Sequence, residues 1–162
     1  MSENTDIVEE NPDIEVRLLT RDDLEAVVRI DAQAWGKPRR DYYRLRIERA
    51  MVDTSVRVSL AAIIDGNVVG FLLGSVYYGD FGVPEPVATI DAIGVDKKHG
   101  RHGVGRAMWK QLATNLKGMR IDRVRTQVEW SSFDLMTFFH KLGFKPASRL
   151  CLDRTLEFDQ DD

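Results

Sequence analysis

The sequence lacks several features that would place it in particular classes of protein. It contains one cysteine among 162 residues, Cys151, so no disulfide forms within the chain and a reducing compartment fits. No apolar run approaches the roughly 18–20 residues of a membrane-spanning helix. The net charge of −3 is too close to neutral to favour general binding to nucleic acid. These absences argue against disulfide-rich, membrane and nucleic-acid-binding proteins, and we expect a soluble cytoplasmic protein.

Further absences limit the chemistry. The three histidines have no metal-ligand spacing with a cysteine or a glutamate pair, so we predict no metal site. No Gly-x-Ser-x-Gly turn is present to hold a nucleophilic serine.

Residues 1–13 are acidic and polar, unlike a secretion signal, and are expected to form a flexible tail. The apolar fraction of 43% is that of a globular protein, and we predict a single domain over residues 14–158.

Apolar periodicity predicts an ordered series of strands and helices. The expected order is β-α-α-β-β-β-α-β-α-β, from about Glu15 to Leu156. Asp65-Gly66 between two apolar runs predicts a hairpin. Near the C-terminus we expect a strand over 124–130, a helix capped by Ser131, and a closing strand over 149–156. No internal repeat or linker interrupts this series.

The most informative feature present is Gly103-Val104-Gly105, which lies between a predicted strand over 88–95 and a predicted amphipathic helix. A loop of this kind leaves several main-chain N–H groups without partners, and the helix dipole adds positive potential there. Basic side chains flank the loop: Arg101, His102 and Arg106. We therefore predict an anionic ligand that carries a diphosphate, bound chiefly by main-chain N–H groups.

Two common phosphate-binding motifs do not match this loop. A P-loop requires Lys-Ser or Lys-Thr after its last glycine, but Arg106-Ala107 follow here. A dinucleotide-binding motif requires a third small residue at the position where Met108 stands. That motif also follows the first strand of its domain, whereas the loop of this chain lies late in the sequence.

The stretch from Val95 to Arg106 resembles the acyl-CoA-binding motif Gln/Arg-x-x-Gly-x-Gly/Ala of the GCN5-related N-acetyltransferases, the GNAT family, with Gly100 at its first position. Residues 138–144 resemble the family's Phe-Tyr-x-x-x-Gly-Phe signature, and the element order is similar to that of its fold. The resemblance implies an α/β (α+β) GNAT fold, a mixed central sheet with helices on both faces. It also implies acetyl transfer from acetyl-CoA to an amine of an unnamed small-molecule or peptide acceptor, and many relatives form homodimers.

The resemblance also implies where coenzyme A binds. Its pantetheine arm is expected between two splayed strands, here residues 90–95 and 124–130, where main-chain groups would bond its amides. An N–H near Ile93 would stabilise the oxyanion formed from the thioester carbonyl, and Gly94 would let the backbone approach closely. The expected cofactor-binding residues are Ile93, Gly94, Val95, Arg101, His102, Gly103, Val104, Gly105, Arg106 and Ser132.

The amine must lose a proton, so the chemistry needs a carboxylate or a water held by one. Asp91 is the first candidate because an acidic residue within an apolar strand is costly unless it is paired or functional. A structural aspartate bound to an amide or an arginine is the alternative. Glu129 is the second candidate, and its alternative is a solvated charge facing Arg125.

One branch of the family has a glutamate where Gln127 stands and a tyrosine where Phe139 stands. The usual tyrosine acid is therefore absent, so the thiolate must leave unassisted, be protonated by water, or take a proton from Tyr77, Tyr78 or another donor. The same absence leaves open a non-catalytic, acyl-CoA-binding regulatory module of the same fold.

A basic stretch covers the region where this family recognises acceptors. Its members are Lys37, Arg39, Arg40, Arg44, Arg46 and Arg49. A solvated helix face is one interpretation, since acidic residues are interleaved. The other is recognition of an acceptor that bears a carboxylate, or of an acidic peptide. Binding of nucleic acid by this stretch is a third hypothesis, against which the overall acidity argues.

Overall fold

The computed structural model describes residues 13–52 and 58–158; most of the expected acidic tail, residues 1–12, lies outside the described residues. The chain divides into two compact units, one ending at Gln127 and one beginning at Val128. The first unit contains the elements β1 (Glu15–Leu18), α1 (Leu24–Trp35), α2 (Arg40–Val52), β2 (Leu60–Ile64), β3 (Asn67–Tyr77), β4 (Val87–Val95), α3 (Val104–Gly118) and β5 (Val124–Thr126). The second unit contains α4 (Phe133–Lys141).

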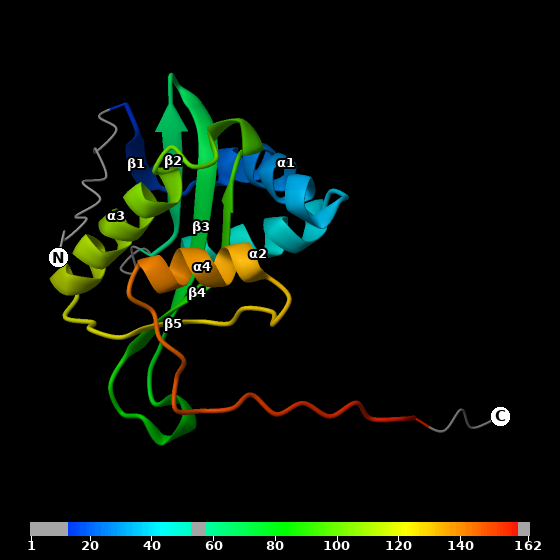
Figure 1. Cartoon of the computed structure of the whole chain (residues 1–162), viewed down its shortest axis with the longest axis vertical. Helices are drawn as coiled ribbons and strands as arrows, with labels where there is room; N and C mark the ends of the chain where they lie inside the picture. The colour runs from blue at the N-terminus through cyan, green and yellow to red at the C-terminus, as the bar shows by residue number, and fades with distance from the viewer. Residues whose placement is uncertain (1–12, 53–57, 159–162) are drawn as a thin grey trace, which may run out of the picture. The chain divides into compact units, whose positions relative to one another are not determined.

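The sheet of the first unit is mixed, as predicted. Its strands follow the order β1-β2-β3-β4-β5, with antiparallel pairing from β1 to β4 and parallel pairing between β4 and β5 (Figure 1). The turn at Asp65-Gly66 joins β2 to β3, which confirms the predicted hairpin. Both residues have positive φ, 49° and 77°, as a tight turn of this kind requires.

Helices cover both faces of this sheet (Figure 1). On one face, a Cβ added at Gly70 of β3 would lie 2.8 Å from a methyl group of Val104 in α3. On the other, a Cβ added at Gly94 of β4 would lie 2.5 Å from the ring of Phe71 and 3.1 Å from Ile30 of α1. The two glycines therefore let α3 and the α1 face pack closely against the same pair of strands.

The apolar periodicity of α1 and α3 gives each helix one buried stripe. In α3 the stripe is Val104, Met108, Leu112 and Leu116, which recur every four residues and are all almost fully buried. On the opposite face of the sheet, side chains of α1, α2, β2 and β3 form one core cluster. Burial of these two apolar surfaces holds β4 and the start of α3 in fixed positions, and these are the elements on which the predicted site depends.

Three predictions about the C-terminal third are wrong. The strand expected over 124–130 ends at Thr126, because β5 pairs only with residues 88–90 of β4, where β4 changes register. No strand is present within the described residues 149–156, all of which are exposed and none of which pairs with another strand. The N-cap of α4 is Ser132 rather than Ser131.

Candidate active site

The loop before α3 has an unusual main-chain conformation. Gly103 is the N-cap residue of α3 with a φ of 82°, a left-handed conformation that glycine adopts without steric cost. Arg101 is also left-handed, with a φ of 62°. Within the described residues, no main-chain N–H from Arg101 to Arg106 donates a hydrogen bond to the protein. These groups lie at the positive end of the α3 dipole, and together they form a site suited to an anion.

Asp96 fixes the start of this loop. Its buried carboxylate accepts hydrogen bonds from the N–H of Lys98 at 3.0 Å and from Nη1 of Arg29 in α1 at 2.7 Å. These two partners hold the pKa of Asp96 below its ordinary value, against the opposing effect of burial. The N–H of Lys97 donates to Oε1 of Gln33 at 2.9 Å. The loop is therefore tied to α1 before it reaches α3.

A β-bulge in β4 places Asp91. Leu73 of β3 lies opposite Ala92, but the next residue, Gly74, lies opposite Ile90, so Asp91 is the extra residue of β4. A bulge bends the strand and redirects its side chains and main-chain groups, and bulges are common beside active sites. The sequence carries no clear signal for it.

Beyond the bulge, β4 has one open edge in the first unit, because β5 pairs with it only before the bulge. The N–H of Asp96 donates to the carbonyl of Val69 in β3 at 2.8 Å. Because successive residues of a strand face opposite edges, Gly94 also faces β3, and Ile93 and Val95 direct their main-chain groups to the open edge. An extended ligand with amide groups can bond there as an added strand would.

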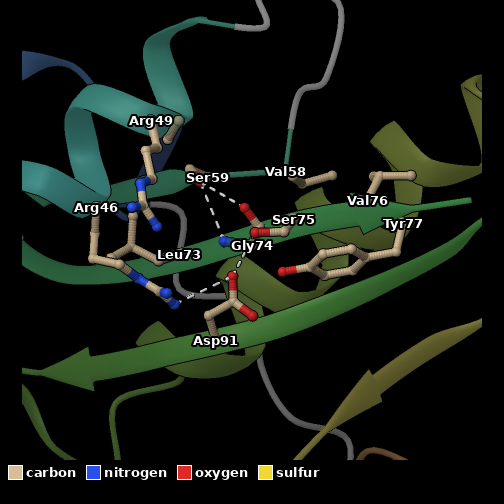
Figure 2. A pocket seen from close by; sticks show the side chains of 11 residues that line it. Arg46, Arg49, Val58, Ser59, Leu73, Gly74, Ser75, Val76, Tyr77 and Asp91 are labelled. Atoms are coloured by element: carbon tan, nitrogen blue, oxygen red, sulfur yellow. Dashed lines mark hydrogen bonds and ion pairs between the residues drawn. The ribbon is translucent and has the colours of Figure 1, made fainter. Parts of the chain in front are cut away.

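A cavity of about 250 Å³ lies between α2 and strands β3 and β4 (Figure 2). Asp91 points into it, and its side chain is 17% exposed. One carboxylate oxygen accepts a hydrogen bond from Ser75 Oγ at 2.6 Å, and the other accepts one from Thr89 Oγ1 at 2.8 Å. Nη2 of Arg46 lies 3.5 Å from the carboxylate. The ring of Tyr77 enters the same cavity, with its hydroxyl directed toward Asp91 (Figure 2).

The structure divides the five arginines of the basic stretch into two groups. Arg39 pairs with Asp31 through two hydrogen bonds of 2.7 and 2.9 Å and stacks 4.0 Å from the ring of Trp35, so it fastens α2 to α1. Two other arginines form ion pairs on the exposed surface: Arg40 with Glu25 and Arg44 with Asp41. Arg40 and Arg44 therefore fit the interpretation as a solvated helix face, whereas the half-buried Arg39 has a structural role before the start of α2.

Arg46 and Arg49 form the second group. Both extend from α2 and line the cavity that contains Asp91 (Figure 2). Arg46 contacts Asp91, and Arg49 has no ion-pair partner among the described residues.

Comparison with known proteins identifies the family. The model of the Acetyltransferase (GNAT) family matches residues 24–144, which include most of the first unit and α4 of the second. The chain belongs to the GNAT family. This confirms the resemblance seen in the sequence, and the mixed sheet with helices on both faces agrees with it.

Solved structures with a similar fold include several named as acetyltransferases, all at low identity. Aminoglycoside N-acetyltransferase AAC(6')-Iy in complex with CoA has a TM-score of 0.73 at 18% identity, over 88% of this chain and 94% of that chain. Ard1 from Thermoplasma volcanium has a TM-score of 0.70 at 24% identity, over 84% and 85% of the two chains. Ribosomal-protein-alanine N-acetyltransferase from Brucella melitensis biovar Abortus 2308 has a TM-score of 0.66 at 18% identity, over 90% and 99%.

The second unit of this GNAT chain contains Glu129 and Ser132. Glu129 is exposed and lies in an irregular segment before α4, so the expectation that it ends a strand is wrong. Ser132 is half-buried at the N-cap of α4, and its side chain makes no capping hydrogen bond there. Phe139 is buried between Phe138 and Phe144, with ring centroids 5.2 and 5.0 Å away. Position 139 therefore lies among apolar rings and offers no hydroxyl that could donate a proton.

Two further features of the GNAT chain bear on its chemistry. No helix within residues 13–52 or 58–158 combines the length and the apolar character that crossing a bilayer requires. Over the same residues, histidine, cysteine and carboxylate side chains form no group of three that could hold a metal ion.

Sequence reasoning missed the partners of Asp91. These partners are Ser75 and Thr89, and Thr89 stands two residues from Asp91, so it lies on the same face of a regular strand. That spacing was an available signal. Ser75 could not be found in this way, because its approach depends on the register between β3 and β4.

Proposed function

We propose that this GNAT protein transfers the acetyl group of acetyl-CoA to the amine of a small-molecule or peptide acceptor. The observation that carries the proposal is the set of unbonded main-chain N–H groups from Arg101 to Arg106, fixed by Gly103 and Asp96. A diphosphate supplies acceptors for several such donors at once. Binding of CoA by the structurally similar AAC(6')-Iy supports the same cofactor.

The proposed cofactor contacts form two groups in the first unit. The N–H groups of residues 101–106 bind the diphosphate, and the exposed side chains of Arg101, His102 and Arg106 add charge or hydrogen bonds. The open edge of β4 at Ile93 and Val95 bonds the pantetheine amides, while Gly94 keeps β4 close to the core. Ser132 belongs to the second unit and is proposed from the family resemblance alone.

Acetyl-CoA supplies a thioester: a bond forms from the amine nitrogen to the carbonyl carbon, the carbon–sulfur bond breaks, the nitrogen loses one proton and the sulfur gains one. An N–H at the open edge of β4 near Ile93 stabilises the oxyanion. Asp91 accepts the proton of the amine, directly or through a water, because among the described residues it is the one carboxylate that lines the cavity. Glu129, in the second unit, is the other candidate base.

Tyr77 is the proposed proton donor to the leaving sulfur. It lines the same cavity as Asp91, while Tyr78 does not line it and is 68% exposed. A phenol hydroxyl both donates and accepts, and can take this role in place of the tyrosine that is absent at Phe139.

The alternative function is a non-catalytic module that responds to acyl-CoA. The burial of Phe139 among other phenylalanines favours it, because this position supplies no acid. Cytoplasmic localisation and a homodimer remain predictions under either function.

Two measurements on the full chain test the proposal. Saturating acetyl-CoA should raise the thermal midpoint of unfolding by several degrees, since a ligand at 100 times its Kd adds about 2.7 kcal/mol. Release of free thiol over a broad amine panel should then exceed the rate without an amine. Binding without turnover on any amine would favour the regulatory module, and no stabilisation at millimolar acetyl-CoA would contradict both functions.

A further inference from the structure

The cavity beside Asp91 carries an excess of positive charge. Among the described residues, the charged side chains that line it are Arg46, Arg49 and Asp91, two cations against one anion. We propose that the acceptor is a small amino-acid-like compound with a carboxylate close to its reactive amine, and that Arg49 binds this carboxylate. The inference rests on the proposed acetyl transfer at the same site.

The two arginines differ in how far their charge is already balanced. Nη2 of Arg46 lies 3.5 Å from Asp91, and the side chain of Arg46 is 31% exposed. Arg49 reaches the same cavity from α2, about one helical turn later, and no described residue forms an ion pair with it (Figure 2). A cation at the wall of a cavity and without a counter-ion is a ready partner for an anionic ligand group. Arginine suits a carboxylate in particular, because its planar donors bind both oxygens.

Asp91 provides the complementary position for the amine. Its carboxylate accepts one hydrogen bond at each oxygen, from Ser75 and from Thr89. Two carboxylate oxygens offer about four acceptor positions, so some remain for an ammonium group. Asp91 points into the cavity from β4 and Arg49 from α2, on the opposite side (Figure 2). A molecule that carries an ammonium group and a carboxylate on the same carbon offers one group to Asp91 and the other to Arg49.

The size and charge of the cavity also argue that the acceptor differs from the aminoglycosides for which similar acetyltransferases are named. A volume of about 250 Å³ falls below the roughly 300–1,000 Å³ of pockets that enclose drug-sized ligands. Two similar structures are aminoglycoside acetyltransferases. An aminoglycoside carries several ammonium groups, which two arginines in one cavity would repel. We therefore expect aminoglycosides and polyamines to be poor acceptors.

The first test measures binding without requiring turnover. Thermal unfolding of the full chain with bound CoA is measured in the presence of each standard amino acid. It is measured again with the matching amino-acid amides, in which a neutral carboxamide replaces the carboxylate. We expect one or more amino acids to raise the midpoint of unfolding, and their amides to bind at least about tenfold more weakly, as the loss of one charge-assisted hydrogen bond predicts. Equal binding of acid and amide, or no stabilisation by any amino acid at tens of millimolar, would overturn the proposal.

The second test assigns the carboxylate to Arg49. In Arg49→Gln, KM for the best amino acid, or its Kd where there is no turnover, should rise about tenfold or more, while that of its amide should stay within about twofold. Binding of acetyl-CoA should not change. Arg44→Gln is the matched control on the same helix, since Arg44 pairs with Asp41 on the surface and does not line the cavity.

The outcomes separate the two proposals. Loss of the preference for acid over amide in Arg49→Gln, with Arg44→Gln unchanged, supports the assignment. Retention of the full preference in Arg49→Gln contradicts it even if acetyl transfer is demonstrated. If acetyl transfer fails for every amine, the acetyltransferase function fails, and the binding preference still decides what the cavity recognises.

Discussion

The two halves of the candidate site are built from different parts of the chain. The proposed cofactor half consists of main-chain N–H groups of residues 101–106, whose directions depend on Gly103 and on the anchoring of Asp96. The proposed acceptor half consists of side chains of Arg46, Arg49 and Asp91, which come from α2 and β4 and line one cavity. A main-chain site tolerates changes of side chain, such as Gly100 where the family has Gln or Arg. A site made of side chains changes when any of those side chains is substituted. The cofactor can therefore be inferred from membership of the family, whereas the acceptor has to be inferred from the side chains of this particular chain.

The largest effect that would sharpen this comparison is expected at Asp91. Asp91→Asn keeps the size of the side chain but removes its ability to take a proton. We expect kcat to fall about 10²–10⁴-fold, because general-base catalysis contributes on that order. The Kd of acetyl-CoA, measured by calorimetry, should remain unchanged, since that half of the site does not use Asp91.

Glu129→Gln is the matched comparison, because it makes the same chemical change at the other candidate carboxylate. An unchanged kcat there would leave Asp91 as the base. If instead Glu129→Gln reduces kcat and Asp91→Asn does not, Asp91 has the structural role that its bonds to Ser75, Thr89 and Arg46 also allow.

The same contrast explains what the sequence could predict. The glycine loop, the start of α3 and the hairpin at Asp65-Gly66 follow from local conformational preferences, and local signals sufficed for them. The surroundings of Asp91 depend on the register of β3 and β4 and on a bulge, which bring together residues distant in the sequence. The prediction of a strand that reaches residue 130 is wrong because strand pairing also depends on this register: β5 pairs with β4 only before the bulge.

Gly103 permits a test of the cofactor half by main-chain conformation. Gly103→Val places a β-branched residue at a φ of 82°, which should cost about 1–3 kcal/mol of folding free energy and distort the loop. Asparagine tolerates this conformation better, so Gly103→Asn should unfold at nearly the wild-type temperature. We expect the Kd of CoA to rise about tenfold in the valine variant, as the loss of one hydrogen bond to a charged group predicts. An unchanged Kd in that variant would show that the loop does not hold the diphosphate.

The smallest effect concerns Asp96 and its dependence on pH. Because its pKa is lowered in the folded protein, Asp96 contributes stability above its unfolded pKa of about 3.9, and this contribution is lost as the pH falls through the folded value. Asp96→Ala should therefore lower the free energy of unfolding by about 1 kcal/mol at pH 7, and the difference from wild type should shrink between pH 5 and pH 3. Denaturant unfolding at each pH measures this, with Asp41→Ala as an exposed control. A difference that stays constant down to pH 3 would mean that packing, and not the charge of Asp96, ties the cofactor loop to α1.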